Sequence, residues 1–185
     1  MGIQETSKNV KFGNYPQTAN GDIQPIDWQV LAIEDNKMLL LSKYGLEAKR
    51  FDVSSNNWKN SEIRQWLNGD FYNKAFSEQE RKNINPSNLS DAGTTDNVFL
   101  LSKEEVERYF AKNKLRKCNA TEYAKATGDY VSSDNGYSYW WLRSSLFLDD
   151  SLFVYYVNIY GAIRYYYAYI NFFAVRPAMW IETGS

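Results

Sequence analysis

The chain contains no histidine and only one cysteine among its 185 residues. Without histidine, a Ser-His-Asp triad, a Cys-His pair and a histidine metal site are all excluded. With a single cysteine, Cys118, neither an intrachain disulfide nor a thiolate zinc cluster can form. Lys114, Arg116 and Lys117 lie close to Cys118 in the sequence, and such cations can lower a thiol pKa. The favoured interpretation is nevertheless an unreactive thiol beside a helix.

Charge excess and long apolar runs are missing as well. The 21 basic and 22 acidic residues give a formal net charge of −1, so no basic surface points to nucleic acid. No apolar run approaches the roughly eighteen residues that a membrane-spanning helix needs. The opening "MGIQETSKNV" lacks the apolar stretch of a signal peptide. We expect no membrane span and no nucleic-acid partner, and the cellular location stays open.

The N-terminal part of the chain predicts strands. "FGNYPQT" is typical of a strand that ends in a turn at Pro16. "IDWQVLAI" and "MLLLSKYG" are two apolar runs separated by "EDNK", which predicts a hairpin. "NVFLLS" predicts a buried strand, and the polar "INPSNLSDAGTTD" predicts a loop.

Helices are expected between Asn60 and Thr127. The first should be capped by Asn60 or Ser61 and stopped by Gly69. Two later helices open with capping boxes, in which a serine and a glutamate three residues further on satisfy each other's backbone donors. These boxes are Ser77 with Glu80 and Ser102 with Glu105.

From "GYSYWWLRS" onward, aromatic and β-branched residues predict strands and loops. The last strand, "FFAVRPAMWIE", carries Pro177 and should therefore lie near a sheet edge or a bulge. The order of strands, helices and strands favours an α+β fold over alternating βαβ units. The length of the chain suits one domain spanning residues 1–185.

The window from Leu142 to Ala178 lacks Lys, Glu, Gln, Met and Trp. The other 148 residues hold all 39 residues of these five types, and at that frequency about ten would fall in the window. Burial in a sheet explains missing Lys, Glu and Gln but not missing Trp and Met. In the same region, seven of the chain's fifteen tyrosines lie between Tyr155 and Phe173.

One genetic filter accounts for this pattern. Codons of the form adenine-adenine-pyrimidine, randomised at their adenines, encode Asn, Tyr, Ser, Asp, Phe, Ile, Leu, Val, Ala, Gly and Arg. They never encode Lys, Glu, Gln, Met or Trp. The window contains only permitted types, apart from fixed positions whose codons need not vary.

The segment resembles the variable region of proteins that are diversified by diversity-generating retroelements. The resemblance rests on a fixed frame, "YWWLRSS" at 139–145, Val157, Gly161 and "AVRPAMWI" at 174–181. The rest of the chain resembles a domain of unknown function common in gut bacterial and phage genomes. That likeness rests on "FGNYPQT", "IDWQVL", "LLLSKYGLEAKRF", "SEIRQWLNGDFYNKAF" and "NVFLLSKEEV", in this order.

The resemblance implies a C-type lectin-like fold, with helices in the middle and a β-rich variable region at 146–173. It implies a non-catalytic receptor or adhesion protein that binds varied ligands, with protein as the favoured ligand class, and that is compatible with display on a phage particle or a cell. Tyrosine suits such a face because it combines a rigid apolar ring with a polar tip. The implied ligand-binding residues are Phe147, Asp149, Asp150, Tyr155, Tyr156, Asn158, Tyr160, Arg164, Tyr165, Tyr166, Tyr167, Tyr169, Asn171 and Phe172.

The frame residues are expected to support the fold. Trp140, Trp141 and Trp180 should lie in the core or form a platform. Arg143 and Arg176 flank the window and are expected to form buried ion pairs, with ligand contact as the alternative. The scaffold set is Trp140, Trp141, Arg143, Val157, Gly161, Arg176 and Pro177.

No cofactor and no metal are expected. Asp149 and Asp150 are adjacent, so in a strand their carboxylates would point apart and could not act as a general acid and base. A loop calcium site stays open, although the "EPN", "QPD" and "WND" ligand sets of sugar-binding C-type lectins are missing. Two other functions compete with diversified binding. One is an undiversified carbohydrate-binding or adhesion module of the same fold. The other is an enzyme like the formylglycine-generating oxidases, which need a cysteine pair that this chain lacks.

Overall fold

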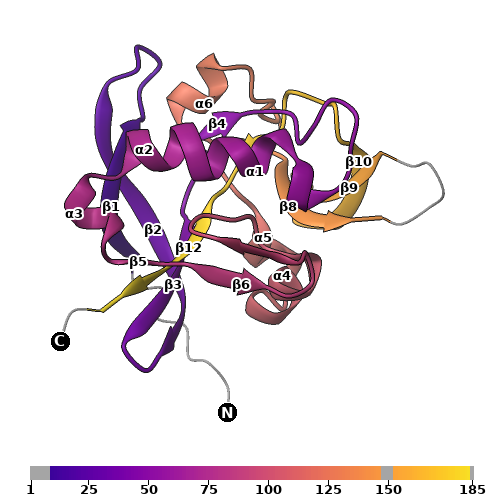
Figure 1. The fold of residues 1–185 in the computed structure, drawn as a ribbon. Helices are drawn as coiled ribbons and strands as arrows, with labels where there is room; N and C mark the ends of the chain where they lie inside the picture. The colour runs from indigo at the N-terminus through magenta and orange to yellow at the C-terminus, as the bar shows by residue number, and fades with distance from the viewer. Residues whose placement is uncertain (1–8, 147–151, 184–185) are drawn as a thin grey trace.

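The computed structural model describes residues 9–146 and 152–183 and shows a mixed α+β fold with two five-stranded sheets (Figure 1). The first sheet joins both ends of the chain, because its order is β1-β2-β3-β12-β5. All of its neighbours are antiparallel. Its strands are β1 (Asn9–Pro16), β2 (Ile23–Glu34), β3 (Lys37–Ser42), β5 (Ile84–Asn85) and β12 (Ala178–Glu182).

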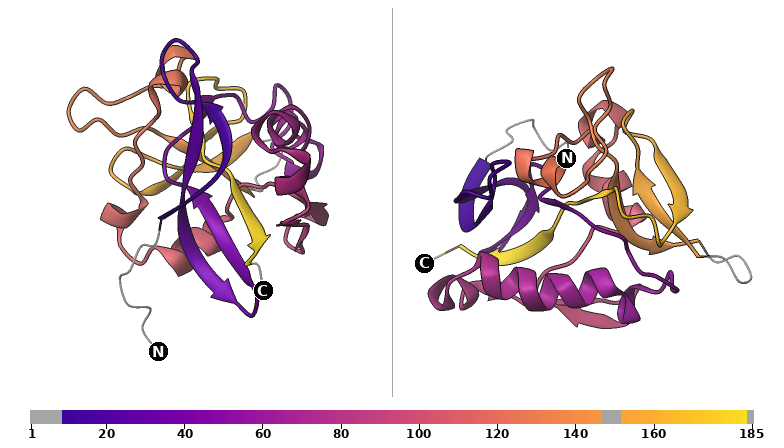
Figure 2. Two further views of the ribbon diagram at one scale, coloured as in Figure 1. Left: turned by 90° about the vertical axis from the view of Figure 1, so that its left-hand side faces the viewer. Right: turned by 90° about the horizontal axis from the view of Figure 1, so that it is seen from above.

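The second sheet carries the tyrosine-rich segment. Its order is β10-β9-β8-β11-β4, and only the β8–β11 contact is parallel. Its strands are β4 (Glu47–Ala48), β8 (Trp140–Ser145), β9 (Phe153–Val157), β10 (Ile163–Tyr167) and β11 (Ala174–Val175). Seen from above, β9 and β10 project at one end of the molecule (Figure 2).

The helices are short and lie between the strand-rich ends of the chain. They are η1 (Trp58–Asn60), α1 (Glu62–Trp66), η2 (Leu67–Phe71), α2 (Tyr72–Ala75), α3 (Glu78–Arg81), α4 (Lys103–Tyr109), α5 (Asn113–Arg116) and α6 (Glu122–Ala126). A small hairpin, β6 (Ser87–Leu89) and β7 (Thr94–Asp96), interrupts them. The expected helical region is confirmed, with η1 starting slightly before Asn60.

Most of the predicted local signals are confirmed. Ser61 caps α1 by accepting the Arg64 backbone N–H, and both capping boxes form. β2 and β3 make the predicted hairpin. The expected stop at Gly69 is wrong, because the helix continues through the π-helical turn η2 into α2 and ends only at Ala75.

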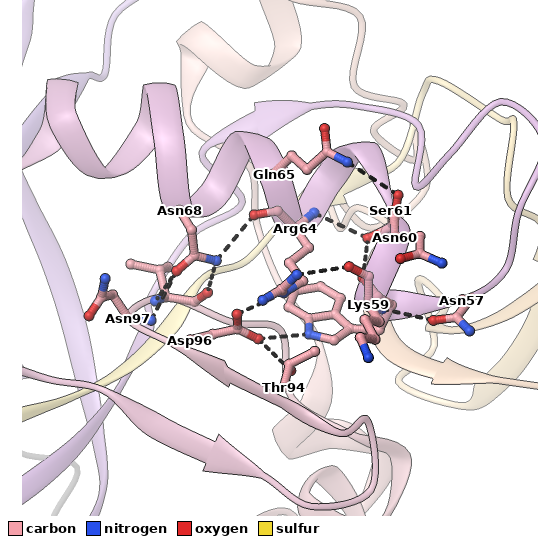
Figure 3. A network of polar contacts seen from close by, with 12 residues as sticks. Asn57, Lys59, Asn60, Ser61, Arg64, Gln65, Asn68, Thr94, Asp96 and Asn97 are labelled. Atoms are coloured by element: carbon pink, nitrogen blue, oxygen red, sulfur yellow. Dashed lines mark hydrogen bonds and ion pairs between the residues drawn. The ribbon is translucent and has the colours of Figure 1, made fainter.

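The carboxylate of Asp96 anchors the helix formed by α1 and η2. Asp96 accepts hydrogen bonds from Trp58 Nε1 at 2.9 Å, from Arg64 Nε at 2.7 Å and from Thr94 Oγ1 at 2.8 Å (Figure 3). Asn68 adds a second tie, since its amide contacts the backbone of Asn97 and Val98. These contacts bind α1 and η2 to the β7 hairpin.

Three further expectations need correction. "NVFLLS" is buried as predicted, but it is an extended segment with a single bridge, Phe99 to Ala178, rather than a strand. The predicted loop at 84–96 contains β5, β6 and β7. Pro177 lies at no sheet edge: it separates β11 from β12, where the chain passes from one sheet to the other. A proline fits there because its missing N–H interrupts a ladder that ends anyway.

The hydrophobic core spans both sheets and contains the expected frame residues. Trp140, Trp141, Val157 and Val175 are fully buried. Trp180 is only partly buried and packs against the edge of the core. Phe51 contacts Trp141 edge to face with ring centroids 6.1 Å apart, which joins the second sheet to the segment before the helices.

Gly161 shows how tightly the β9–β10 turn is held. Its φ of +79° suits glycine, and a Cβ there would lie 1.8 Å from the Asn113 carbonyl oxygen. Gly21 has a similar φ of +83°, but a Cβ added there would meet nothing within 4 Å, so it is a matched control. We predict that Gly161→Ala lowers the free energy of unfolding by more than about 3 kcal/mol, and Gly21→Ala by roughly 1–2 kcal/mol.

Urea unfolding of both variants measures the difference between them. Equal losses would show that the turn does not press against Asn113 and that backbone strain alone sets the cost.

Candidate functional site

The candidate site is the β9–β10 hairpin with the segment that follows it. The two strands pair without a bulge, and Tyr165 lies opposite Tyr155. Asn158 shapes the turn, because its Oδ1 accepts the backbone N–H groups of Tyr160 and Ala162, both at 2.9 Å. Asn158 was expected to contact ligand, but its side-chain oxygen is used within the turn.

The other expected ligand-binding residues divide by exposure. Tyr155 and Tyr156 are half-buried, and both pack against the core. Phe147, Asp149 and Asp150 lie outside the described residues. The exposed members, whose aromatic side chains are 37–59% exposed, are Tyr160, Arg164, Tyr165, Tyr166, Tyr167, Tyr169, Asn171 and Phe172.

One face of the hairpin carries a ladder of aromatic rings. Phe153 lies 5.4 Å from Tyr165 and 4.7 Å from Tyr167, between ring centroids. Tyr167 in turn stacks on Tyr169 at 5.1 Å, and Tyr155 meets Tyr165 edge to face at 6.1 Å. Phe153 was absent from the expected site, although it lies in the same aromatic window.

The opposite face is more deeply packed. Tyr156 lies 4.6 Å from Phe173 and 5.6 Å from Tyr139, and Trp141 lies beneath them. Burial raises the pKa of both Tyr139 and Tyr156. Tyr166 covers the outer side of this cluster, 6.1 Å from Phe173. Tyr156 is therefore a structural as well as a surface residue.

Tyr130 and Tyr139 extend this face, and the sequence pattern did not predict them. Their rings stack at 5.5 Å, and the Tyr130 backbone N–H donates to the Phe172 carbonyl. Both precede the window, so the missing residue types could not mark them. The aromatic density of "YVSSDNGYSYWW" was the available signal.

The two flanking arginines behave differently. Arg143 is 3% exposed in its side chain and forms the expected ion pairs, with Asp91 at 2.8 Å and Glu105 at 2.7 Å. Arg176 is equally buried, but within the described residues it has no carboxylate partner. Its Nε donates to the Ser42 carbonyl at 2.7 Å, and its guanidinium lies over Trp140. The expected ion pair of Arg176 is thus wrong.

An open cavity of about 480 Å³ adjoins the hairpin beside Tyr155. Its wall contains two acids, Asp91 and Glu104, and two bases, Lys103 and Arg143. The lining is therefore charge-balanced and suits a neutral polar molecule. Asn171 borders a second cavity, of about 320 Å³.

In the described part of the chain, the side chains that could ligate a metal do not cluster, and the one thiol is buried. Over residues 9–146 and 152–183, no group of three or more Cys, Asp or Glu side chains could hold a metal ion. Cys118 is buried, and burial raises the pKa of its thiol. The neighbouring cations therefore do not make it a reactive thiolate.

Comparison with known proteins gives a family without an assigned activity. The model of a family described as "Domain of unknown function (DUF6273)" matches residues 35–183. Neither the curated proteins nor the solved structures contain a significant match to the chain. Within the described part of the chain, no helix is long and apolar enough to cross a membrane.

Asp129 directly precedes Tyr130 in the chain and is a buried acid, so its protonation is coupled to folding. It accepts the Ser138 hydroxyl at 2.7 Å, while its Oδ1 is buried without a partner. Burial raises the pKa of Asp129 to about 7, against about 3.9 for an unfolded chain. Between these two values the folded state holds a proton that the unfolded state has lost.

We therefore predict that the free energy of unfolding falls as the pH rises from about 4 to about 7, by at most roughly 3–4 kcal/mol. Asp129→Asn should remove most of this fall. Urea unfolding at about pH 4 and about pH 8 measures it, and the lack of histidine keeps that interval free of imidazole titration. An unchanged pH dependence in the variant would show that Asp129 titrates normally.

Proposed function

The chain belongs to the DUF6273 family of unknown function, and from its geometry we propose a non-catalytic binding protein. Its β9–β10 hairpin is the diversified, ligand-binding face. The partners are varied ligands, mostly protein surfaces, met through exposed aromatic rings. The residues that vary are changed by adenine mutagenesis from a retroelement. Display on a phage particle or a cell fits this role.

One observation carries the proposal: the exposed aromatic side chains of the window all lie at proposed variable positions, whereas the members of the scaffold set are buried. The variable region also contains buried residues, such as Phe173. Tyr160, Tyr165 and Tyr169 are 45–59% exposed. Val157 and Trp140, which belong to the frame, are fully buried. A scaffold that accepts many sequences needs this division, because large-to-small changes in a core cost roughly 2–5 kcal/mol each.

The number of exposed aromatic rings supports binding to a macromolecule. Five tyrosines and one phenylalanine of the segment are at least 37% exposed, and they follow one another along 160–172. Contiguous exposed aromatic patches usually mark interaction sites. Tyrosine also loses little conformational entropy on binding, since it has only two side-chain torsions.

We further propose a single domain with a C-type lectin-like fold. Two features support it: the first and last strands share a sheet, and the variable hairpin belongs to a second sheet inserted between them in sequence. Catalysis has no support in the inventory of side chains, because the chain offers no histidine and one buried cysteine.

A carbohydrate-binding or adhesion module is the second candidate, and the cavity beside Tyr155 favours it. Balanced charges, hydroxyls from Ser144 and Ser145 and a tyrosine ring are what a neutral sugar ring contacts. In that case the hairpin does not vary between copies of the gene. Sequencing the gene across a population separates the two, since only diversification predicts adenine-directed changes confined to the window. A neighbouring template repeat and reverse transcriptase would support the first candidate.

The division of labour can be tested by stability. We predict that changing Tyr160, Tyr165, Tyr167 and Tyr169 together to Ser lowers the free energy of unfolding by no more than about 2 kcal/mol, because all four are at least 40% exposed. The same variant should lose binding to any ligand selected on the parent protein. Thermal melting and a binding assay give the two measurements.

Phe173→Ala is the control, since this ring is 3% exposed. It should cost roughly 3–5 kcal/mol. Unfolding of the tyrosine variant to the same extent would place those rings in the core and remove the main support for a binding face.

A further inference from the structure

Strand β10 is the outermost strand of the second sheet. It pairs with β9 on one side, and no strand of the described residues pairs with it on the other. Four consecutive residues, 164–167, are exposed, so both faces of the strand are open to solvent. An edge strand that projects from its sheet exposes both of its faces, and Figure 2 shows from above that this hairpin projects at one end of the molecule.

The backbone of β10 is turned alternately toward and away from β9. The Asn158 N–H donates to the Ala162 carbonyl at 2.9 Å, which fixes the hydrogen-bonded pairs of the hairpin. Counting along the register, Arg164 and Tyr166 direct their backbone groups to β9, and Ile163, Tyr165 and Tyr167 direct theirs outward. In agreement, the Ile163 carbonyl accepts a hydrogen bond from Arg164 Nη1 at 2.8 Å, and the Tyr167 carbonyl accepts one from the Ile170 N–H at 3.2 Å. The Tyr165 N–H, the Tyr165 carbonyl and the Tyr167 N–H are left facing outward.

Of the devices that usually prevent strand addition, this edge carries one charged side chain, Arg164. Proteins blunt exposed edges with charged side chains, above all lysine, with proline or with a bulge. β10 contains no lysine and no proline, and its pairing with β9 runs without a register shift. Its side chains instead offer rings on both faces, Tyr165 and Tyr167 on one and Tyr166 on the other.

We propose that β10 binds an extended, acidic peptide segment of the partner by strand addition. The peptide continues the second sheet beyond β10 and pairs with the outward backbone groups of Tyr165 and its neighbours. Its alternate side chains pack on the tyrosines of the two faces. This mode of recognition rests on the proposed binding function and says how the partner is held.

The preference for acidic residues follows from the charge of the edge strand. Arg164 is exposed and has no ion-pair partner within the described residues. A carboxylate at the matching position of the added strand would meet this guanidinium.

The strand arrangement also explains why side-chain variation need not destroy affinity. Backbone hydrogen bonds supply a sequence-independent part of the binding, and the exposed rings supply selectivity. Replacing one tyrosine then changes which peptide is preferred without removing the template on which it aligns.

The test begins with a displayed library of linear peptides of about ten residues, selected on the whole protein. Each selected peptide is resynthesised with single N-methyl groups along its backbone. We expect N-methylation at alternate residues to weaken binding at least about tenfold and at intervening residues to be tolerated. A library without binders, or a scan without alternation, overturns the proposal.

Matched variants of the protein give the complementary result. Tyr165→Pro removes the outward N–H, whereas Tyr165→Ala removes only the ring. Strand addition predicts that the proline variant loses binding at least about tenfold more than the alanine variant does. Equal losses overturn it. Because proline could disturb the hairpin, amide exchange on the parent protein provides a second readout: bound peptide should protect the N–H groups of Tyr165 and Tyr167.

Two controls isolate the chemistry. Arg164→Glu should weaken the selected peptides at least about tenfold and reverse the preference for acidic residues. Concentration-dependent dimerisation of the parent that Tyr165→Pro abolishes would assign the edge to a second copy of the chain and overturn the peptide proposal. One pattern of results would separate the two proposals. If the four-tyrosine serine variant loses binding, but neither N-methylation of the peptide nor Tyr165→Pro weakens binding, the proposed function stands and only strand addition is overturned.

Discussion

The two sheets depend on one segment, residues 174–182, which belongs to both. β11 lies between β8 and β4, and β12 lies between β3 and β5. At the junction the Arg176 guanidinium lies 4.8 Å from the ring centroid of Trp140 and donates to the Ser42 carbonyl. Burial lowers the pKa of Arg176, which reflects the unfavourable environment for its charge. The buried cation nevertheless ties the two sheets, since its bonds reach one sheet and its flat face packs on the other.

With that junction fixed, the exposed side chains of the hairpin contribute little to the core, although its Val154 and Val157 are buried there. Trp140 and Trp141 fill the space beneath β9 from the neighbouring strand, and the turn is held by backbone contact at Gly161 rather than by a large side chain. The exposed tyrosines therefore stack mainly on one another. Aromatic pairs of this kind contribute about 0.5–1.5 kcal/mol beyond their buried area, so changes among them are small against a typical domain stability of about 5–15 kcal/mol.

Local chemistry made part of this structure predictable. Ser77 with Glu80 and Ser102 with Glu105 signal helix starts because short-range hydrogen bonds decide them. Gly69 does not end its helix because tertiary packing of Leu67 and Phe71 carries the helix across it. For the candidate site, composition located the hairpin but could not rank its tyrosines. Burial of Tyr156 comes from Tyr139 and Phe173, and Tyr139 directly precedes β8, outside the window. Such contacts between distant residues leave no periodic pattern in an aromatic-rich strand.

The proposed genetic filter and the open sheet edge fit together physically. Randomised adenines in adenine-adenine-pyrimidine codons never yield lysine, the residue most often used to protect an exposed edge from strand addition. They readily yield tyrosine, asparagine, serine and aspartate, which suit a recognition surface. A strand diversified by this route tends to remain able to pair while its side chains change. β10 shows this combination, with exposed rings, a single arginine and no lysine. When the side chains vary, the backbone groups of the edge strand remain available for hydrogen bonds, and these supply affinity for any extended peptide. The varied side chains then decide which peptide binds more tightly.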